Sequence, residues 1–585
     1  MSNIYSFEKA LEGRSDLLKY TDNRLLLFAL EMYRGIEDIH SIATDSLTDG
    51  SGDKKCDLVF IDREKGYVIV AQGYYSDSHS KTEAPANKAS DLNTAVTWLL
   101  SNDYSKLPPT LKAAAMELHD ALNNGEVSVL ELWYVHNLPE SINVKDELKR
   151  VEYTALGLLR LNYKVNVETV SAKEIGKNTL EAWYRGTQAP ILVTDTATFD
   201  TTGGYYTQGD NWAAYSTAVP AKWLQDMYVK YGRELFCANV RDYLGSRRSD
   251  KNINHNMKLT AQTAPERFWV YNNGITALVN DFEHDADGST GILQIHGIAI
   301  VNGAQTTGAL GSLTDVELAN AFVPARFVKC SDQSTIQRII HYNNSQNRLE
   351  AADFKSNDPI QSRLRREFDD IPDVEYQGGR RGGEVDKILR KPNIIPSYTA
   401  GQALAAFHQE PAIAYNQKSN IWESDSLYSR VFPSQITARH LLFTFSLLKS
   451  IEQRKMTLRS IPESERTESQ REQINFFELR GSSFLLVAAV AASMEILLGK
   501  AIPDTFLLQW KDRVSLQQAI DNWSQVIVCI LPFANSLGKA ISENRLQNKE
   551  NVHEKISIFR SLVEATRTVN EAVFSQMAQK VESAK

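Results

Sequence analysis

The sequence predicts an α/β protein of three parts: an N-terminal α/β sandwich (1–185), a central α+β domain (186–435) and a C-terminal helical domain (436–585). Three observations predict this. Strand-like and helix-like segments alternate in the first third, and the composition shifts toward Thr, Gly, Tyr and Asn from about Ile191. After about Pro433, apolar residues recur at spacings of three and four. A chain of 585 residues is also too long for one hydrophobic core.

The composition is that of a soluble globular protein, with 42% hydrophobic and 23% charged residues. The net charge of −8 argues against a uniformly basic nucleic-acid-binding surface but allows a local basic patch. Cysteines 56, 237, 330 and 529 lie far apart, which disfavours a disulfide framework or a zinc knuckle. The N-terminus does not resemble a signal peptide, and the apolar run 484–498 is shorter than the roughly 20 residues of a membrane span. We therefore expect a cytoplasmic protein that does not enter the membrane.

Three polar residues stand out in the first third. Glu31 lies in a helix-like segment (18–39), Asp57 opens a strand-like run (56–61), and Gln72 ends a second run (67–72). This layout resembles the PD-(D/E)xK nuclease core, in which an Asp on one strand and an acid or amide on the next hold a divalent cation. The resemblance implies a restriction-endonuclease-like sandwich with catalytic and Mg²⁺-binding roles for Glu31, Asp57 and Gln72.

One position departs from that pattern. The lysine expected two residues after Gln72 is Tyr74, whose phenol has a pKa of about 10 and cannot supply an ammonium group. Either the lysine has moved to the next helix, with Lys88 a better candidate than Lys81, or the site keeps the fold without hydrolysis. For Asp57 itself, the alternative is an ordinary residue at the start of a strand, facing solvent.

The rest of the first third fits the same architecture. We expect a buried strand at 127–136, an amphipathic helix at 144–161 and a further strand at 165–170.

Two Asn-Gly phrases dominate the central part, at 271–276 and 301–307. The first predicts a hairpin between strands at 268–271 and 275–279. The second predicts a strand, a tight turn and a helix start, a geometry that can hold a phosphate. Their candidate nucleic-acid-binding or nucleotide-binding residues are Asn272, Asn273, Asn302, Gln305 and Thr306. Alternatively, these side chains cap the helix and the turns.

The candidate cations lie elsewhere in the central part. A loop at 245–258 is locally basic, and arginine matches phosphate geometry in bidentate fashion. The candidate phosphate contacts are Arg241, Arg247, Arg248, Arg380 and Arg381. A solvated loop is the alternative for 245–258.

Several of these phrases together resemble the AIPR family, named for abortive infection phage resistance. The resemblance rests on Asn239-Val240-Arg241, the two Asn-Gly phrases, Asn344-Ser345-Gln346-Asn347, Arg380-Arg381-Gly382 and the run 402–408. It implies bacterial defence against phage, with DNA or RNA as the suspected target and a partner protein from a defence operon.

The last third shows four helix-like stretches, at 437–452, 476–498, 515–531 and 552–580. We expect a scaffold or a homo-oligomerisation domain there. Three hypotheses follow for the whole chain: a Mg²⁺-dependent nuclease with an atypical site, an inactive nucleic-acid-binding or nucleotide-binding regulatory subunit, and a nucleotide switch centred on 301–307.

Overall fold

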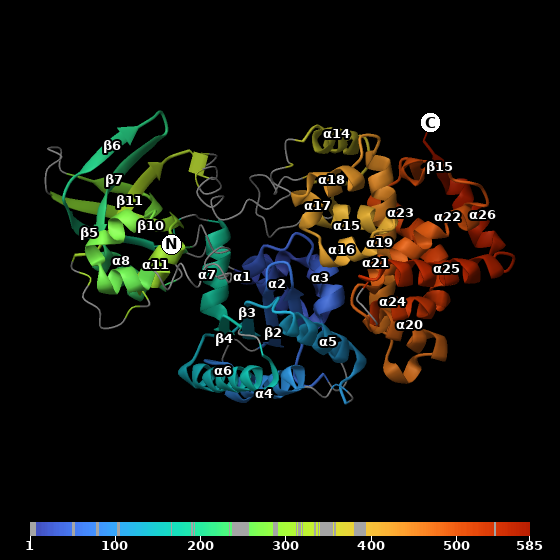
Figure 1. Ribbon diagram of the computed structural model, residues 1–585, viewed down its shortest axis with the longest axis horizontal. Helices are drawn as coiled ribbons and strands as arrows, with labels where there is room; N and C mark the ends of the chain where they lie inside the picture. The colour runs from blue at the N-terminus through green and yellow to red at the C-terminus, as the bar shows by residue number, and fades with distance from the viewer. Residues whose placement is uncertain are drawn as a thin grey trace.

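The structure is a computed structural model of the 585-residue chain. It describes residues 7–48, 53–77, 81–101, 104, 106–164, 167–188, 191, 193–232, 235–236, 257–284, 291–311, 313, 318, 320–332, 335–336, 339, 355, 358–378, 393–542 and 546–584. The described part is mixed α/β, as expected. A head (blue to teal) lies beside C-terminal helices (orange to red), and a separate sheet (green) lies on the far side of the head (Figure 1).

The head contains a four-stranded mixed sheet in the order β1-β2-β3-β4. Its strands are β1 (Leu58–Asp62), β2 (Tyr67–Tyr74), β3 (Val129–His136) and β4 (Thr169–Ile175). β1 runs antiparallel to β2, and the remaining pairs are parallel. Parallel neighbours require long crossovers, which are α4 (Ala86–Leu100) and α5 (Pro109–Asn123) before β3, and α6 (Ile142–Asn162) before β4. The strands expected near 56–61, 67–72 and 127–136 and the helix near 144–161 are confirmed; the strand expected at 165–170 begins at Thr169.

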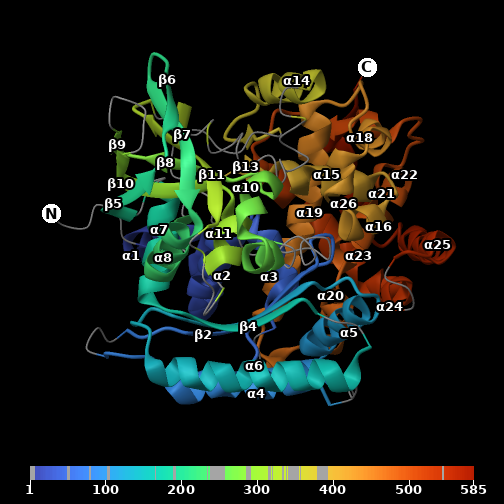
Figure 2. The ribbon, with the colours of Figure 1, turned by 60° about the vertical axis from the view of Figure 1, so that its left-hand side comes forward.

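Helices cover both faces of this sheet, and the residues of β2 and β3 are largely buried on both sides. One core joins Leu58, Ile69 and Trp133 to α2 (Arg24–Arg34). The other joins alternate strand residues to α4, α5 and α6, and Figure 2 shows α4 and α6 lying side by side along this face. The remaining head helices are α1 (Phe7–Gly13), α3 (Ile39–Ser46), α7 (Lys177–Gln188) and the 3₁₀ segment η1 (Ser15–Asn23).

The central sheet has the order β5-β10-β8-β11-β7-β6, and β9 pairs with β10. Its strands are β5 (Val193–Thr201), β6 (Gly204–Gln208), β7 (Trp212–Pro220), β8 (Ile275–Val279), β9 (Asp281–Glu283), β10 (Gly291–Asn302) and β11 (Phe322–Cys330). The helices α8 (Ala221–Tyr231) and α11 (Ala304–Gly311) share a core with one face, through residues such as Leu224, Ala277 and Phe327.

The expected hairpin at 268–279 is wrong in its first strand. Residues Phe268–Tyr271 form one helical turn, α10, preceded by the 3₁₀ turn η3 (Pro265–Arg267). Proline favours the first position of such a turn, and Phe268 is buried in the core while the next three residues face outward. Burial of Phe268 thus overrides the β propensity of the run. The expected strand–turn–helix at 298–307 is confirmed as β10 followed by α11.

The remaining helices share one hydrophobic core that runs from Leu364 to Val581. We call the part from 393 to 584 the helical body. The boundary expected between 435 and 436 lies within the sequence of this core, which includes Ile436. The helices are α14 (Pro359–Phe368), α15 (Ser397–Phe407), α16 (Pro411–Asn416), α17 (Asn420–Glu423), α18 (Asp425–Val431), α19 (Ala438–Arg459), α20 (Glu468–Glu478), α21 (Ser482–Ala492), α22 (Met494–Leu498), α23 (Leu516–Ile530), α24 (Gly538–Ser542), α25 (Lys549–Ala565) and α26 (Glu571–Lys580).

Short elements complete this region. They are the 3₁₀ turns η5 (Glu463–Glu465), η6 (Thr505–Leu507) and η7 (Leu531–Leu537) and the two-stranded pairs β12 (Glu375–Tyr376) with β13 (Ile394–Ile395) and β14 (Leu508–Trp510) with β15 (Val581–Ser583). The expected single helix at 476–498 is instead broken, with a 109° bend between α20 and α21, and α21 is buried. Gly481, with φ +85°, stands at that break.

One described helical stretch, Leu516–Ser542, is long and apolar enough by length and composition to cross a membrane. Core helices of soluble proteins meet the same criteria, and here Trp523, Ile527 and Ile530 are buried in the core of the body.

Candidate functional site

The two Asn-Gly phrases meet at one end of the central sheet. Gly303 has φ +93°, and a Cβ there would lie 2.6 Å from the carbonyl oxygen of Gly274. Gly274 has φ +80°, and a Cβ there would overlap the carbonyl oxygen of Pro324. Only glycine combines this backbone conformation with so close an approach. We call the surface formed by 269–274 and 302–306 the Asn-Gly edge.

Side-chain hydrogen bonds join the two phrases. The Asn272 Oδ1 accepts from the Gly274 backbone N–H at 2.8 Å and from the Thr306 hydroxyl at 3.0 Å. The Asn272 Nδ2 lies 3.1 Å from the Met257 sulfur. Asn272 and Thr306, both expected to bind ligand, therefore also hold the turn and the helix start together, as an Asx turn does.

The strand register places three polar side chains in a row next to this contact. Asn302 on β10 and Arg326 on β11 both pair with Thr276 on β8, so the three side chains share one face of the sheet. The Arg326 guanidinium donates to the Thr276 hydroxyl at 3.2 Å. This face is opposite the one that packs on α8 and α11, where Ile275 and Ala325 lie. Sequence reasoning missed Arg326; a cation inside the apolar run 322–328 was the available signal.

The outer side of the edge is unusually apolar. Trp269, Val270 and Tyr271 on α10 are 43%, 76% and 66% exposed. Beside them Asn273 is exposed and Gln305 is half-buried. Within the described ranges neither amide makes a hydrogen bond, so both are available to a ligand. The other predicted cations, Arg241, Arg247, Arg248, Arg380 and Arg381, lie outside the described residues.

In the head, the β1–β2 register brings Asp57 and Gln72 to neighbouring strand ends, because Leu58 pairs with Ala71. The Asp57 Oδ2 accepts from the Gly73 backbone N–H at 2.7 Å. Gln72 is 3% exposed, and its Oε1 has no hydrogen-bond partner among the residues that the structure describes. A buried acceptor without a partner is costly, so the Gln72 amide is a candidate ligand-binding group.

Glu31 is directed elsewhere. Its Oε2 lies 2.6 Å from the Arg14 Nη1, and both side chains are buried. Burial alone would lower the pKa of Arg14, but Asp16 and Glu31 outweigh it and raise that pKa. Leu26 lies against Gly73 and the Tyr33 hydroxyl lies 3.1 Å from that of Tyr67, so α2 runs antiparallel to β2.

This direction separates Glu31 from Asp57. Glu31 is about 7–8 Å along the helix axis from Leu26, toward the Tyr67 end of β2, whereas Asp57 bonds to Gly73 at the opposite end. The structure therefore brings Asp57 and Gln72 together and turns Glu31 to Arg14.

Neither predicted lysine contacts Asp57 or Gln72 in the part of the chain that the structure describes. The Lys81 amine donates to the Tyr74 hydroxyl at 2.7 Å, and Lys88 is half-buried in the first turn of α4. Among the described residues, no group of three His, Cys, Asp or Glu side chains could hold a metal ion. Magnesium usually keeps several water ligands and takes one or two protein carboxylates. Of the three predicted ligands, Asp57 and Gln72 lie together, whereas Glu31 is paired to Arg14.

A buried ionic group on β3 was missed by sequence reasoning. Glu131 is 1% exposed and pairs with Lys173 of β4, and it also accepts from the Tyr33 hydroxyl at 3.0 Å and the Trp133 indole at 2.8 Å. Burial would raise the pKa of Glu131, but Lys173 outweighs it and lowers that pKa. The group ties β3, β4 and α2 together. A single glutamate inside the apolar run 129–136 was the available signal.

The chain thus combines an α/β head, a mixed sheet with a glycine-dependent edge, and a helical body. The family model described as AIPR protein matches residues 236–572, from the central sheet region through most of the helical body. The chain belongs to the AIPR family, which associates it with abortive infection phage resistance. No curated protein and no solved structure matched it.

Proposed function

We propose that this AIPR protein serves antiphage defence by binding single-stranded nucleic acid at the Asn-Gly edge, without cleaving it in the head. The observation that carries the proposal is the convergence of both Asn-Gly phrases on one surface. That surface presents the exposed aromatic rings of Trp269 and Tyr271 beside the amides of Asn273 and Gln305.

These groups suit bases that are not stacked in a duplex. A base stacked on an aromatic side chain contributes about 1–3 kcal/mol, and every base offers a face for it. Asn and Gln amides can pair with base edges, adenine above all. In a duplex the base faces are hidden, so Trp269 and Tyr271 favour a single strand.

Two arginines lie on the segments next to the rings. Arg267 precedes α10 with a side chain that is 64% exposed, and Arg326 lies on the neighbouring row of the sheet. Guanidinium groups match phosphate geometry, so these two residues are suited to the backbone of the strand. The protein as a whole carries a net charge of −8, so attraction for phosphate has to come from local cations such as these.

Fluorescence anisotropy with the full chain tests the proposal. Labelled single-stranded DNA, single-stranded RNA and a duplex of one sequence are titrated in EDTA, so that cleavage cannot interfere. We expect both single strands to bind more tightly than the duplex, and Trp269→Ala and Tyr271→Ala each to weaken binding about tenfold. Tyr153→Ala, which removes a 72% exposed ring from α6, is the matched control. Unchanged binding by both edge variants would refute the proposal.

A metal-dependent nuclease in the head is the second candidate function. It is favoured by the unpartnered, buried Oε1 of Gln72 at the strand end next to Asp57. Incubating the protein with DNA and with RNA in Mg²⁺ or Mn²⁺ tests it, with Asp57→Ala as the site variant and Asp146→Ala, on the exposed surface of α6, as the control. Absence of cleavage by the wild type removes this candidate. Equal cleavage by Asp57→Ala places any active site elsewhere.

A further inference from the structure

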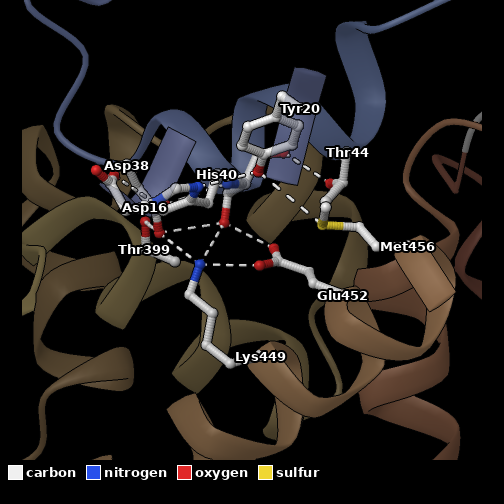
Figure 3. A network of polar contacts seen from close by, with 10 residues as sticks. Asp16, Tyr20, Asp38, His40, Thr44, Thr399, Lys449, Glu452 and Met456 are labelled. Carbon is white, nitrogen blue, oxygen red and sulfur yellow. Dashed lines mark hydrogen bonds and ion pairs between the residues drawn. The ribbon is translucent and has the colours of Figure 1, made fainter. Parts of the chain in front are cut away.

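The head and the helical body meet through charged side chains, shown in close-up in Figure 3. The Lys449 amine of α19 lies 2.6 Å from the Asp38 Oδ2 and 2.8 Å from the Glu452 Oε2. Ser41 of α3 donates to Glu452 at 2.6 Å, and Thr399 of α15 donates to Asp38 at 3.1 Å. Residues separated by about four hundred positions thus form one hydrogen-bonded group.

Further polar contacts extend the interface. The Arg480 guanidinium donates to the Glu117 carboxylate at 2.8 Å and to the Val59 carbonyl oxygen at 2.6 Å. Further contacts include Lys455 with Asp45 at 2.5 Å, Lys418 with Asp62 at 3.7 Å, and the Ser419 backbone N–H with Glu64 at 3.0 Å. In each of these ion pairs the head supplies the carboxylate and the body supplies the cation.

The apolar cores do not merge across this interface. The two head cores and the core of the body are separate clusters, and among the described residues Met456 is the body residue that packs on a head core. Buried ion pairs gain little net free energy, because desolvation offsets their attraction. Polar interfaces between domains resemble transient protein–protein interfaces, for which relative motion is expected.

The chain connectivity also permits separation. The head ends near 188 and the body begins near 393, so the central region, rather than a short linker, connects them. The head could move away from the body without breaking either core.

We propose that these contacts form a latch, and that its closed state covers the backbone of Val59 on the edge strand β1 of the head sheet. β1 is the outermost strand of that sheet, and the Arg480 guanidinium donates to the Val59 carbonyl oxygen. At the preceding residues, Asp57 and Leu58, the edge is paired within the head by Leu47 and Thr48. Backbone groups on an edge strand are otherwise available to a partner strand or ligand. Opening the latch frees the Val59 carbonyl oxygen, so the body controls access to this part of the edge strand.

Lys449 is the residue to change, since it neutralises Asp38 and Glu452 at once. In Lys449→Ala the two carboxylates face each other across Ser41, and their repulsion opens the latch. The triple variant Asp38→Asn, Lys449→Met, Glu452→Gln keeps similar shapes without charge and should stay closed. Arg560→Ala removes a comparable cation from an exposed ion pair with Glu495 inside the body and is the control.

Hydrogen exchange of the full chain, read by mass spectrometry, measures the opening. In Lys449→Ala we expect amides of Ile39–Ser46 and of the segments 62–66 and 415–420 to exchange at least tenfold faster, with Ser482–Ala492 and Ile275–Val279 unchanged. The radius of gyration from X-ray scattering should rise. Exchange within twofold of wild type would overturn the proposal, as would equal acceleration in Ser482–Ala492, which reports unfolding of the body.

A milder variant tests the proposal even if Lys449→Ala does not fold. Lys418→Glu places a carboxylate beside Asp62 at a position that is 29% exposed, on the rim of the interface. It should accelerate exchange in 62–66 and 415–420 alone, and no change there would equally overturn the proposal. The latch does not depend on nucleic-acid binding at the Asn-Gly edge, so either proposal can fail without the other.

Discussion

Gly303 lies against Gly274, so close that a Cβ on Gly303 would stand 2.6 Å from the Gly274 carbonyl oxygen. Each glycine belongs to one of the two Asn-Gly phrases, and each has a positive φ. The glycines of the two phrases that mark the family are therefore required, first of all, for packing. Because the turns pack together, the amides and rings that flank them are held in fixed positions, which is what a recognition surface needs.

Gly303→Ala should destabilise the central sheet by more than the about 1–3 kcal/mol that a positive φ costs a non-glycine residue, because the contact with Gly274 adds to it. Gly157→Ala is the matched control: it lies on α6 with no atom within 4 Å of the added Cβ. There we expect a stabilisation of up to about 1 kcal/mol. Calorimetry would contradict the prediction if both variants melted alike.

Thr306→Val should loosen the link between the phrases, since the hydroxyl donates to Asn272 and the isosteric methyl cannot. We expect a loss of about 1 kcal/mol and faster amide exchange in 272–276. The control is Thr154→Val, whose hydroxyl bonds to its own helix on an exposed face. Equal effects of the two substitutions on exchange in 272–276 would speak against the link.

Arg14→Ala should cost about 3–5 kcal/mol in the head, because it leaves Glu31 buried without its cation. The double variant Arg14→Met, Glu31→Gln should recover much of this loss in urea unfolding. If Arg14→Ala unfolds like wild type, the pair is not what fixes Glu31, and a metal-binding role for Glu31 regains support.

The strands and long helices could be predicted from the sequence because their side chains are buried in regular patterns. β3, apolar throughout except for Glu131 and His136, and α21 are clear examples. The run Phe268–Tyr271 could not, because its β propensity is outweighed by burial of Phe268 alone. Short elements of this kind are decided by tertiary contacts.

The candidate sites were only partly predictable. Asp57 and Gln72 meet because adjacent strands in a hairpin have a predictable register. The pairing of Arg326 with Thr276 depends on a parallel register between distant strands, and the Lys449–Asp38 ion pair joins distant segments. In sequence such charged residues look like ordinary solvated side chains.

Two histidines in the body form a neutral chain of hydrogen bonds. The His440 Nδ1 lies 2.7 Å from the Leu508 carbonyl oxygen, which can only accept, so this nitrogen carries the proton. The His440 Nε2 therefore accepts from the His408 Nε2 at 3.0 Å, and the Thr505 hydroxyl donates to the other nitrogen of His408 at 3.3 Å. Protonating His440 would place an N–H group on its Nε2, facing the N–H group of the His408 Nε2.

Stability should therefore fall in acid through this pair. Burial lowers the pKa of His440 to about 4, and burial together with the neighbouring His440 lowers that of His408 to about 2. The unfolded chain takes up these protons below about pH 6.5 while the folded chain does not, so the free energy of unfolding falls between about pH 6.5 and 4. The loss is at most about 1.4 kcal/mol per pH unit for each histidine.

The difference between wild type and His440→Gln isolates this effect, because other titrating groups contribute to both proteins. We expect wild type to be the more stable at pH 7.5 and its advantage to shrink steadily toward pH 5, since only wild type must keep His440 neutral against acid. His553→Gln, at an exposed position, should give a curve parallel to wild type. Parallel melting curves for His440→Gln and wild type would show that His440 does not titrate as its burial requires.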